Sequence, residues 1–517
     1  MTDVTVVIAV YNTMPYLRDC LGSVFEQSIG RDRLEVVAVD DGSTDGSGDE
    51  LDRSQQRFPD TMRVIHQENS GGPAVPSNRG LELATGRYVF FLGADDRLGP
   101  EALARLVAAA DELEADIVLG RLVGDGGRYV SQAVYDPGDR DDITLVNSAL
   151  PMALSNTKLY RRSMLEEHRI RYPEGLTSGS DRPFTLQAIA HARRVAVRSD
   201  YKFYYAMRRT DSSNITYGTP LHDLLHDAAT VMDLTADLIT DPVAHARLVH
   251  RHFSWELAKL LGPRFLQVDR AEQTRVQEGI RKLAETYLTE EIRRKIDVHK
   301  RVLISVAQFG SLDDLLAVVR HQTEQKFGPV VVEGDRHYVA YPGFRVFPNE
   351  WFDGTERFVK REHQAGPATV RWGRNAAGQR AVVVEWRSTL ADLHHPDEPR
   401  PRAFAGDHVA VHTDISADGL IRADFVLDDL VAEERTSRRR QVRFTRTVGG
   451  EYQSLPVTWT TGARLTRVLH RQGARIWVVS AVAAGRHNQL RIVVHTITPR
   501  RLVGALARRL RLKPYPD

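Results

Sequence analysis

Pairs of acidic residues follow two apolar segments near the start of the chain. Asp40-Asp41 comes directly after the run 34–39, and Asp95-Asp96 comes shortly after the run 88–92. Carboxylates at strand ends suit a hard divalent cation that also holds phosphate oxygens. Each pair alone has a plainer interpretation, because Asp-Asp-Gly-Ser is a common turn and acidic residues ahead of a helix favour the helix dipole.

A loop between the two acidic pairs has the composition of an anion-binding segment. Asn69-Ser70-Gly71-Gly72-Pro73 precedes the helical stretch that carries Ser77-Asn78-Arg79-Gly80. Glycines leave backbone N–H groups accessible, and the N-terminus of a following helix favours negative charge. The loop and the two acidic pairs together indicate a ligand that bears phosphate.

The elements that must position these residues alternate between strand and helix over residues 1–218. Val4–Val10, the two runs that precede the acidic pairs and the short run 64–66 predict strands, and residues 16–27 have helical spacing. Strand and helix in alternation indicate an α/β fold with a mostly parallel sheet. Ligands of such sheets bind at the carboxyl ends of the strands, where both acidic pairs lie.

The rest of the chain changes its periodicity twice. Residues 219–327 carry apolar residues at three- and four-residue spacing, which predicts helices. Residues 328–498 switch to period two with frequent turns, which predicts one or two β-sandwich modules. A short basic amphipathic helix ends the chain. The predicted domains are 1–218, 219–327, 328–430, 431–498 and 499–517.

Composition limits the class of protein. The 517 residues are 42% hydrophobic and 27% charged, as in ordinary globular proteins. No apolar run approaches the ~20 residues of a membrane-spanning helix, and the single cysteine, Cys20, excludes an intramolecular disulfide. A cytoplasmic protein is therefore the simplest expectation. The net charge of +2 names no partner by itself.

The motifs in this order resemble the glycosyltransferase family 2 domain, which has the GT-A fold. The resemblance covers residues 3–216, and the segments that carry it are 6–12, 39–45, 69–80 and 90–96 with Pro100. It implies a Rossmann-like catalytic domain for a nucleotide-sugar. The chain departs from the family at two positions. Gly93 replaces the first Asp of the family's Asp-x-Asp motif, and Ser77 stands where the family commonly has Arg.

The resemblance implies roles for individual residues. Ala9 at the end of the first strand and Tyr11 would flank the nucleotide base, and Asp40 would accept a hydrogen bond from the uracil. Asp95 would be the direct ligand of Mn²⁺ or Mg²⁺. The implied donor-binding residues are Ala9, Tyr11, Asp40, Asn69, Arg79, Ala94, Asp95, Asp96, Arg209 and Ser213.

The general base of the family is an aspartate in an acidic pair ahead of a helix. Asp181 matches it, with Ser180 in place of the acidic neighbour. The alternative is that Asp181 caps the helix 182–189, and the two roles are compatible. The implied mechanism is a single inverting displacement, in which Asp181 takes a proton from the acceptor hydroxyl. Arg209 and Ser213 would lie on a loop that closes over the donor diphosphate, and a solvated charge pair is the alternative for the arginine.

The order of the domains resembles the wall teichoic acid glycosyltransferases of Gram-positive bacteria. Those enzymes transfer N-acetylglucosamine from its UDP donor to polyol-phosphate polymers, and their C-terminal modules form oligomers, often trimers. The resemblance therefore implies a UDP-sugar donor, an anionic polyol-phosphate acceptor and a homo-oligomer. Nucleic acid is not expected, because the sequence shows no recognised nucleic-acid module and its overall charge is near zero. Two alternatives stay open: a family 2 transferase for capsular polysaccharide or glycolipid, and a non-catalytic relative that binds polymer.

Two basic clusters and the terminal helix bear on the acceptor. The clusters are Arg435, Arg438, Arg439, Arg440, Arg443 and Arg446, and His245, Arg247, His250, Arg251, His252 and Lys259. Basic side chains along a path suit a phosphate polymer, whereas a solvated face is the plainer interpretation. The terminal helix has two interpretations: contact with an anionic membrane surface, here the inner face of the cell membrane, or packing on a partner subunit.

Overall fold

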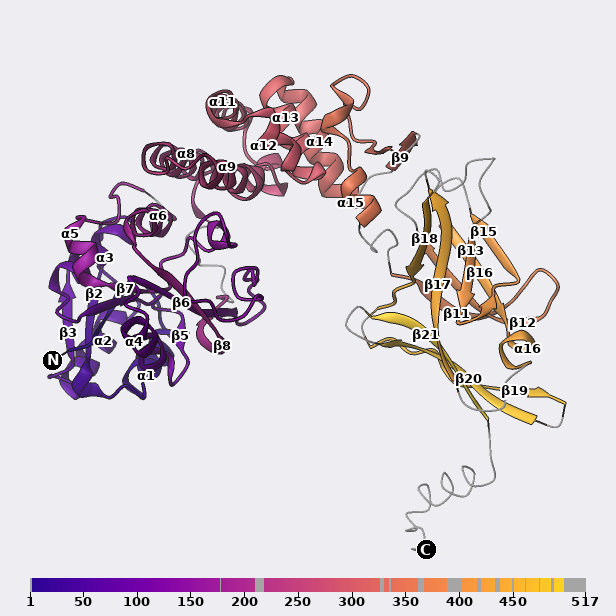
Figure 1. The fold of residues 1–517 in the computed structure, drawn as a ribbon, viewed down its shortest axis with the longest axis horizontal. Coiled ribbons are helices and arrows are strands. Elements are labelled where there is room, and N and C mark those ends of the chain that lie inside the picture. The colour runs from indigo at the N-terminus through magenta and orange to yellow at the C-terminus, as the bar shows by residue number, and fades with distance from the viewer. Residues whose placement is uncertain are drawn as a thin grey trace, which may run out of the picture. The chain divides into compact units, whose positions relative to one another are not determined.

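Figure 1 shows the computed structural model of the chain, which folds into two compact units. The first unit comprises Met1–Ile296 with Leu303–Leu312, and the second comprises Asp297–Val302 with Asp313–Asp517. The structure describes residues 2–176, 178–209, 218–325, 330–333, 336–360, 367–387, 401–415, 420–432, 438–448, 451–460, 462–473, 475–484 and 488–496.

An eight-stranded sheet forms the centre of the first unit, in the order β3-β2-β1-β4-β7-β6-β8-β5. Its strands are β1 Val4–Val10, β2 Leu34–Asp40, β3 Met62–His66, β4 Tyr88–Phe91, β5 Arg97–Leu98, β6 Ile117–Gly124, β7 Leu159–Arg161 and β8 Val195–Ala206. The pairs among β1 to β4 and the pair β6–β8 are parallel, whereas β7 and β5 run antiparallel to their neighbours. The predicted α/β class with a mostly parallel sheet is confirmed.

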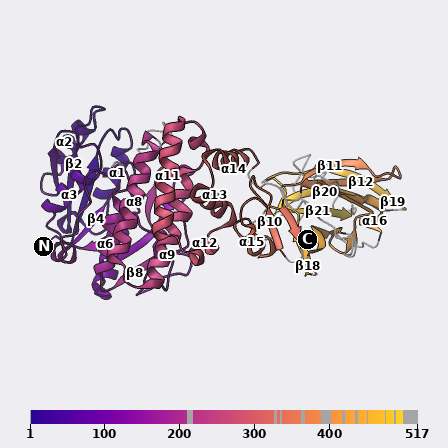
Figure 2. The ribbon, with the colours of Figure 1, turned by 90° about the horizontal axis from the view of Figure 1, so that it is seen from above.

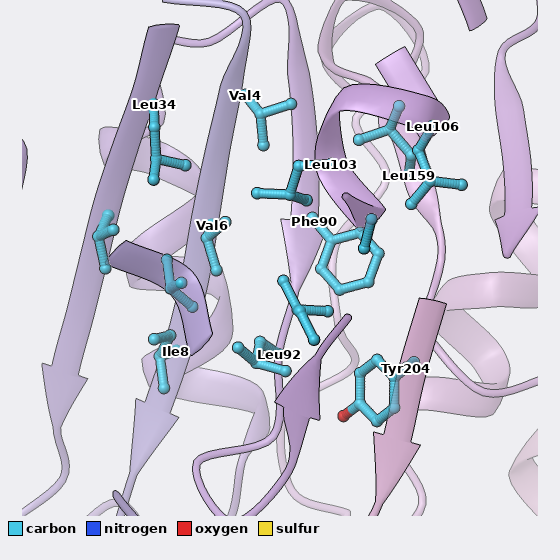
Figure 3. Packing of buried hydrophobic residues seen from close by; sticks show 14 of the residues in the cluster. Val4, Val6, Ile8, Leu34, Phe90, Leu92, Leu103, Leu106, Leu159 and Tyr204 are labelled. Atoms are coloured by element: carbon cyan, nitrogen blue, oxygen red, sulfur yellow. The ribbon is translucent and has the colours of Figure 1, made fainter. Parts of the chain in front are cut away.

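Helices cover both faces of this sheet, in keeping with β1, which is apolar apart from Thr5. The helices are α1 Leu17–Phe25, α2 Ser47–Arg57, α3 Ala74–Leu83, α4 Ala102–Glu112, α5 Arg162–Glu167 and α6 Asp181–His191. Val4, Val6 and Ile8 of β1 pack with α1 and α4 (Figure 3), and Val7 faces the opposite core with α3 and α6. The sheet is thus rigidly held between two cores.

The strand order changes direction at β1. β1 lies between β2 and β4, so the chain leaves β1 toward one side of the sheet and returns on the other. Such a change of direction is where α/β sheets bind ligands. The loops after β1, β2, β3 and β4 therefore meet at one edge.

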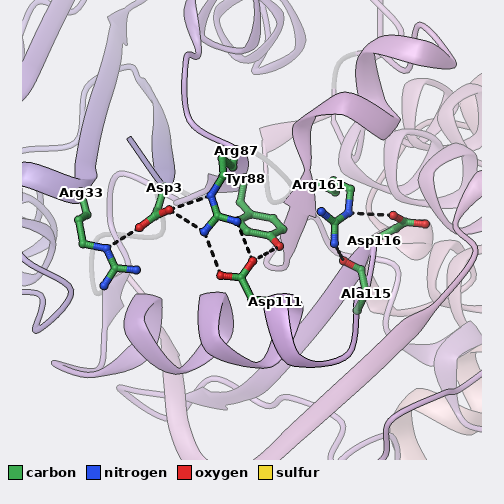
Figure 4. Close-up of polar contacts among 8 residues, drawn as sticks. All are labelled: Asp3, Arg33, Arg87, Tyr88, Asp111, Ala115, Asp116 and Arg161. Carbon is green, nitrogen blue, oxygen red and sulfur yellow. Dashed lines mark hydrogen bonds and ion pairs between the residues drawn. The ribbon is translucent and has the colours of Figure 1, made fainter. Parts of the chain in front are cut away.

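The opposite edge of the sheet is closed by charges (Figure 4). Asp3 accepts hydrogen bonds from Arg33, which precedes β2, and from Arg87 at 2.6 and 2.8 Å, which precedes β4. Arg87 also reaches Asp111 of α4 at 2.7 and 2.9 Å, and Asp111 accepts the Tyr88 hydroxyl at 2.7 Å. Ion pairs therefore join the amino ends of three strands and leave the carboxyl ends to the site.

A helical segment follows the sheet in the chain; its helices up to Lys295 belong to the first unit, and residues 298–325 are divided between the two units. It comprises α8 Leu221–Leu238, α9 Pro242–Arg251, a π-helix His252–Leu257, α10 Ala258–Leu260, α11 Arg270–Tyr287, α12 Glu290–Lys295, α13 Val298–Phe309 and α14 Leu312–Gln325. Val231 of α8 and Leu248 of α9 share a core with Phe184 of α6, and α8 lies along α11 (Figure 2). The sequence predicts one helix over 242–260, whereas the structure interrupts it with the π-helix.

The second unit contains antiparallel sheets, as the period-two pattern predicts. One sheet is β11-β12-β16-β15, and another is β14-β13-β17-β21-β20-β19 with β18 beside β17. The strands are β11 Thr369–Arg374, β12 Arg380–Arg387, β13 Arg402–Ala405, β14 His408–Val409, β15 His412–Ile415, β16 Leu420–Val426, β17 Arg438–Val448, β18 Glu451–Pro456, β19 Val468–Gln472, β20 Arg475–Ala484 and β21 Gln489–Thr496. A hairpin of β9 Val330–Glu333 and β10 Arg336–Val339 and the short helices α15 Thr355–Lys360 and α16 Leu427–Val431 complete this unit.

Two features of the second unit bear on the predicted domain limits. β13 pairs with β17, so strand pairing crosses residue 430, where the sequence places a boundary. The predicted basic helix at 499–517 lies outside the described residues.

Among the helices that the structure describes, none is long and apolar enough to cross a membrane.

Candidate active site

Asp40, at the end of β2, is buried and fixed from two sides. Its Oδ1 accepts the backbone N–H of Ser43 at 3.1 Å, and its Oδ2 lies 2.9 Å from Nδ1 of His66. Nε2 of the same histidine lies 2.9 Å from Asp52, and hydrogen bonds to Asp52 and Asp40 raise the pKa of His66. The sequence analysis missed His66, although it ends a predicted strand at the same edge of the sheet.

The loops after β1 and β2 are tied together through Asn12. Its backbone N–H donates to Ser43 Oγ at 3.1 Å, and its side-chain oxygen accepts the N–H of Thr44 at 2.8 Å. Asn12 adopts a φ of 48°, a conformation that asparagine tolerates better than most residues. The neighbouring Tyr11 is 46% exposed, so its ring is available to a ligand at this edge, and Ala9 is half-buried.

Asp41 orders the glycine-containing loop. Its carboxylate accepts the N–H and the hydroxyl of Ser70, at 3.1 and 2.9 Å, and the side-chain amide of Gln67 at 2.6 Å. Asn69 donates to the backbone carbonyl of Asp41 at 3.0 Å. Asn69 is exposed and lies next to the β2 loop, as a donor-binding residue requires.

Asp95 and Arg209 come together at the same edge, although 114 residues separate them. Nε of Arg209 donates to Oδ2 of Asp95 at 2.6 Å, and Nη1 donates to the carbonyl of Asn12 at 3.5 Å. The predicted residues Asp95, Arg209 and the end of β1 are therefore one cluster. Ala94 is buried in the core beside them. Ser213 lies outside the described residues.

Asp96 is buried beneath Asp95. The Tyr204 hydroxyl donates to Asp96 at 2.6 Å, and the N–H of Met207 donates at 2.7 Å. Burial, followed by the charge of Asp95, raises the pKa of Asp96 to about 6. A Cβ atom on Gly93 would lie 2.7 Å from Asp96 Oδ2, so the carboxylate of Asp96 occupies the space that a side chain at position 93 needs.

Arg79 lies away from these clusters. Its side chain is about half exposed on α3 and pairs with Glu82 at 3.4 Å. The buried Ser77 and Asn78 precede it, and Asn78 exchanges two hydrogen bonds with the backbone of Tyr172, at 2.8 and 2.9 Å. The structure therefore places Arg79 with a surface partner, and its role toward the donor stays a prediction.

Asp181 is the first residue of α6 and lines a cavity of about 570 Å³. Its carboxylate forms no hydrogen bond or ion pair with any residue that the structure describes. Burial lowers the pKa of the nearby Lys158 to about 7, against the opposing charge of Asp181. The lining is Leu122, Val130, Ser131, Tyr135, Met152, Ala153, Leu154, Ser155, Ser178, Gly179, Asp181, Arg182, Leu221, Leu224, Arg251, Trp255, Glu256, Lys259, Leu260, Gly262, Pro263 and Arg264.

The Asp181 cavity and the donor edge are connected through the core rather than by a shared lining. Asp40 and Asp95 are not among the described lining residues. Phe184, one turn after Asp181, meets Phe91 at the end of β4 with ring centroids 5.1 Å apart. Since Phe91 precedes the Gly93–Asp96 turn, this contact fixes the start of α6 against the acidic loop.

At this edge of the sheet, the carboxylate of Asp95 is suited to bind a cation. Arg209 already places a positive group on its carboxylate. Among the described residues, no group of three or more His, Cys, Asp or Glu side chains could hold a metal ion. A divalent ion at Asp95 would therefore need most of its ligands from the donor phosphates and water, as is usual for Mg²⁺.

The first basic cluster is largely built into the protein, whereas the described arginines of the second are mostly exposed. His252 and Arg251 are buried, Arg247 donates to the carbonyls of Val146 and Ser148, and His250 contacts the carbonyl of Lys295. Lys259 lines the cavity instead. In the second cluster Arg438, Arg439 and Arg443 are exposed, whereas Arg440 is buried and donates to Leu430. Arg435 and the side chain of Arg446 lie outside the described part of the chain.

Two family models match successive parts of the chain. Residues 5–169 match the model described as Glycosyl transferase family 2, and residues 222–319 match the model described as Glycosyl transferase TarS linker domain. The chain therefore carries a family 2 glycosyltransferase domain followed by a TarS linker domain. This is the class of domain that the strand order and the acidic turns indicate.

Individual relatives are named as poly(ribitol-phosphate) glycosyltransferases. The chain is 33% identical over 218 residues to a poly(ribitol-phosphate) β-glucosyltransferase of Bacillus spizizenii, covering 42% of this chain and 34% of the relative. It is 34% identical over 264 residues to the poly(ribitol-phosphate) β-N-acetylglucosaminyltransferase TarS of Staphylococcus aureus, covering 49% of this chain and 45% of the relative. The aligned part thus spans less than half the length of these relatives.

The similarity to solved structures covers more of the chain than the sequence matches do. The crystal structure of S. aureus TarS aligns with a TM-score of 0.65 at 21% identity, covering 97% of this chain and 86% of that one, which shows a shared fold. S. aureus TarS 1–349 in complex with UDP-GlcNAc aligns with a TM-score of 0.56 at 26% identity, covering 66% and 97%. The predicted order of catalytic domain, helical segment and C-terminal β modules is therefore confirmed.

Proposed function

We propose that this protein is an inverting glycosyltransferase that moves a sugar from a UDP donor to a hydroxyl group of a polyol-phosphate polymer of the cell wall. The observation that carries this proposal is the succession of a family 2 domain and a TarS linker domain in one chain. The relatives named above support the acceptor class, because both act on poly(ribitol-phosphate) according to their names.

The proposed sugar is N-acetylglucosamine. The TarS structure that aligns at 26% identity holds UDP-GlcNAc. The B. spizizenii relative is named as a glucosyltransferase, so UDP-glucose is the donor to compare directly. At the donor edge, Tyr11 and Asp40 would bind the uracil, and Asn69, Asp95 and Arg209 would surround the diphosphate and sugar. The buried Asp96 would support Asp95 from within the fold.

Charge on the departing diphosphate must be offset at this edge. A divalent ion such as Mn²⁺ or Mg²⁺, when bound, supplies positive charge there, and Asp95 would hold it. Arg209 brings a permanent positive charge to the same carboxylate. We propose that its guanidinium turns from Asp95 to the donor phosphates, because bidentate contact with phosphate suits arginine.

Asp181 would act as the general base. It takes the proton of an acceptor hydroxyl while the hydroxyl oxygen bonds to the anomeric carbon. The bond between that carbon and the UDP oxygen breaks, and UDP leaves with the electron pair. Because the oxygen attacks from the face opposite to UDP, the configuration at the anomeric carbon inverts, and no enzyme nucleophile is needed.

The cavity beside Asp181 suits a phosphate polymer. Lys259 and Arg264 line it with positive charge, and Lys259 has no ion-pair partner among the described residues. Trp255 lines the same cavity, and its ring lies 6.4 Å from that of Tyr129 in a stacked arrangement. Cations for the phosphates and aromatic faces for the carbon chain are the groups that a polyol-phosphate would contact.

The test is transfer by the purified full chain from UDP-GlcNAc to a synthetic oligo(ribitol-phosphate), with release of UDP as the readout. We predict that Asp181→Asn lowers kcat by about 100- to 10,000-fold, the range of general base catalysis, and leaves UDP affinity unchanged. Asp200→Asn is the matched control, because Asp200 is exposed and its ion-pair partner among the described residues is Arg105, at 3.1 Å. Full activity of Asp181→Asn would contradict the assignment.

A further inference from the structure

The helical segment contributes two buried carboxylates that hold the residues around Asp181. We call residues 178–182 the base segment. Asp227 of α8 accepts the N–H of Ser178 at 3.1 Å and its hydroxyl at 3.0 Å. Glu256 of the π-helix accepts Nη1 of Arg182 at 3.2 Å. The two contacts lie on opposite sides of Asp181, three residues before it and one residue after it.

Asp181 depends on these neighbours for its position. Its own carboxylate has no hydrogen-bond or ion-pair partner among the described residues, so the backbone of the base segment sets where it points. Gly179 has a φ of 68°, and a Cβ atom there would lie 2.1 Å from Nη2 of Arg182. The arginine therefore folds back over a turn that only glycine allows, and Glu256 holds it there.

The carboxylate of Glu256 is costly to bury, and the surrounding charges compensate for this. Its side chain is 9% exposed, and it contacts Arg251 and His252 as well as Arg182. Burial alone would raise the pKa of Glu256, but Arg251, His252 and Arg182 together hold it well below the ordinary value. Buried ion pairs of this kind are weak contributors to stability and are often better explained by the geometry that they impose.

The π-helix is a second, independent sign of a local function. π-helices are rare, and the short ones inside α-helices are frequently found at functional sites. This one, His252–Leu257, interrupts an otherwise continuous helix. Its His252 is buried and lies 3.2 Å from Thr235 of α8, so the segment that carries Glu256 is fixed to the helix that carries Asp227.

We propose that Asp227 and Glu256 are positioning residues for the general base, so that the linker domain completes the catalytic apparatus rather than only spacing the domains. This inference rests on the proposed function for the role of Asp181. The proposal predicts that loosening either contact misplaces the carboxylate relative to the acceptor hydroxyl. Donor binding at Tyr11 and Asp40 would not change.

Glu256→Gln in the full chain tests the proposal. The amide keeps the shape and removes the charge that holds Arg182. We expect kcat to fall about 10- to 100-fold, the cost of a small misplacement of a catalytic group, with the KM for UDP-GlcNAc and the affinity for UDP within twofold of the wild type. Asp227→Asn is the second variant, and it should show a smaller loss of the same kind.

Hydrogen–deuterium exchange measures the position of the base segment without turnover. We expect faster exchange in the peptide that spans 178–182 in Glu256→Gln and unchanged exchange in the peptide that spans 36–45. Glu291→Gln is the matched control, because Glu291 is 79% exposed and pairs with Lys295 within α12. It should alter neither exchange nor kcat.

The outcomes separate this inference from the proposed function. If the wild type transfers no sugar but exchange still rises at 178–182 in Glu256→Gln, the proposed function fails and the positioning contact stands. If an active wild type gives variants with kcat within twofold and unchanged exchange, the positioning role is overturned. Parallel losses of kcat, UDP affinity and thermal stability would also overturn it, because they indicate a purely structural role.

Discussion

Within each acidic pair one aspartate serves the fold and the other faces the ligand edge. Asp41 orders the loop at Ser70, and Asp96 is buried under the Tyr204 hydroxyl. Asp40 instead contacts His66, and Asp95 contacts Arg209. A charged ligand could replace either of these contacts. The two members of a pair are adjacent in sequence, but their surroundings differ because successive residues in an extended turn point to opposite sides.

Gly93 is the residue whose departure from the family has a physical reason. We predict that Gly93→Asp, which restores the family's usual residue, lowers the free energy of unfolding by about 1–3 kcal/mol, because the new side chain overpacks against Asp96. It also adds a third carboxylate beside Asp95 and Asp96, so activity should fall rather than rise. Urea unfolding and the transfer assay measure both effects. A stable variant with higher activity would contradict this account of position 93.

Among the elements, the amino and carboxyl ends of the strands have different roles. The amino ends of β1, β2 and β4 are joined by Asp3, Arg33 and Arg87, and the carboxyl ends carry the site. A change at the amino ends should therefore affect stability without affecting donor binding.

Arg87→Met tests this separation. Arg87 holds the pKa of Asp111 below its ordinary 3.8, and with Arg33 it keeps the pKa of Asp3 low against the effect of burial. A lowered pKa stabilises the fold above pH 3.8, and this contribution is lost as the pH falls through the lower folded-state value. We predict a loss of about 1 kcal/mol at pH 7, since the pairs are partly exposed, that shrinks below pH 4. UDP affinity should stay unchanged, and a weakened affinity would contradict the separation.

The local periodicity of apolar residues predicts most helices and strands of the first unit. The run 34–39 and the helix Leu221–Leu238 follow their apolar patterns closely, because burial on one face imposes the period. The approach of Arg209 to Asp95 and of Glu256 to Arg182 cannot be predicted in this way, since each pair is distant in sequence and its meeting depends on how the helices pack. The π-helix is also not predictable from spacing, because its apolar residues fit an ordinary helix.

At the scale of the whole molecule, the second unit is where assembly is proposed to occur. Its antiparallel sheets match the fold of S. aureus TarS over nearly the full chain. The limits of the five predicted domains stay a proposal, and the pairing of β13 with β17 favours treating residues 402–496 as one module.

We predict that the full chain forms a homo-oligomer of about three subunits through its C-terminal modules. Closed, symmetric assemblies are the usual form of such oligomers. Light scattering coupled to size-exclusion chromatography should give a mass about three times that of the 58.2 kDa chain. A mass of one chain at all concentrations would contradict the prediction.

Transfer of a sugar to a polyol-phosphate with inversion is the activity that we propose for this chain. The most direct measurement is proton NMR of the product formed by the full chain from UDP-GlcNAc and oligo(ribitol-phosphate). The account predicts one β-linked N-acetylglucosamine on a ribitol hydroxyl for each UDP released. An α-linked product, or UDP release with no sugar on the polymer, would contradict it.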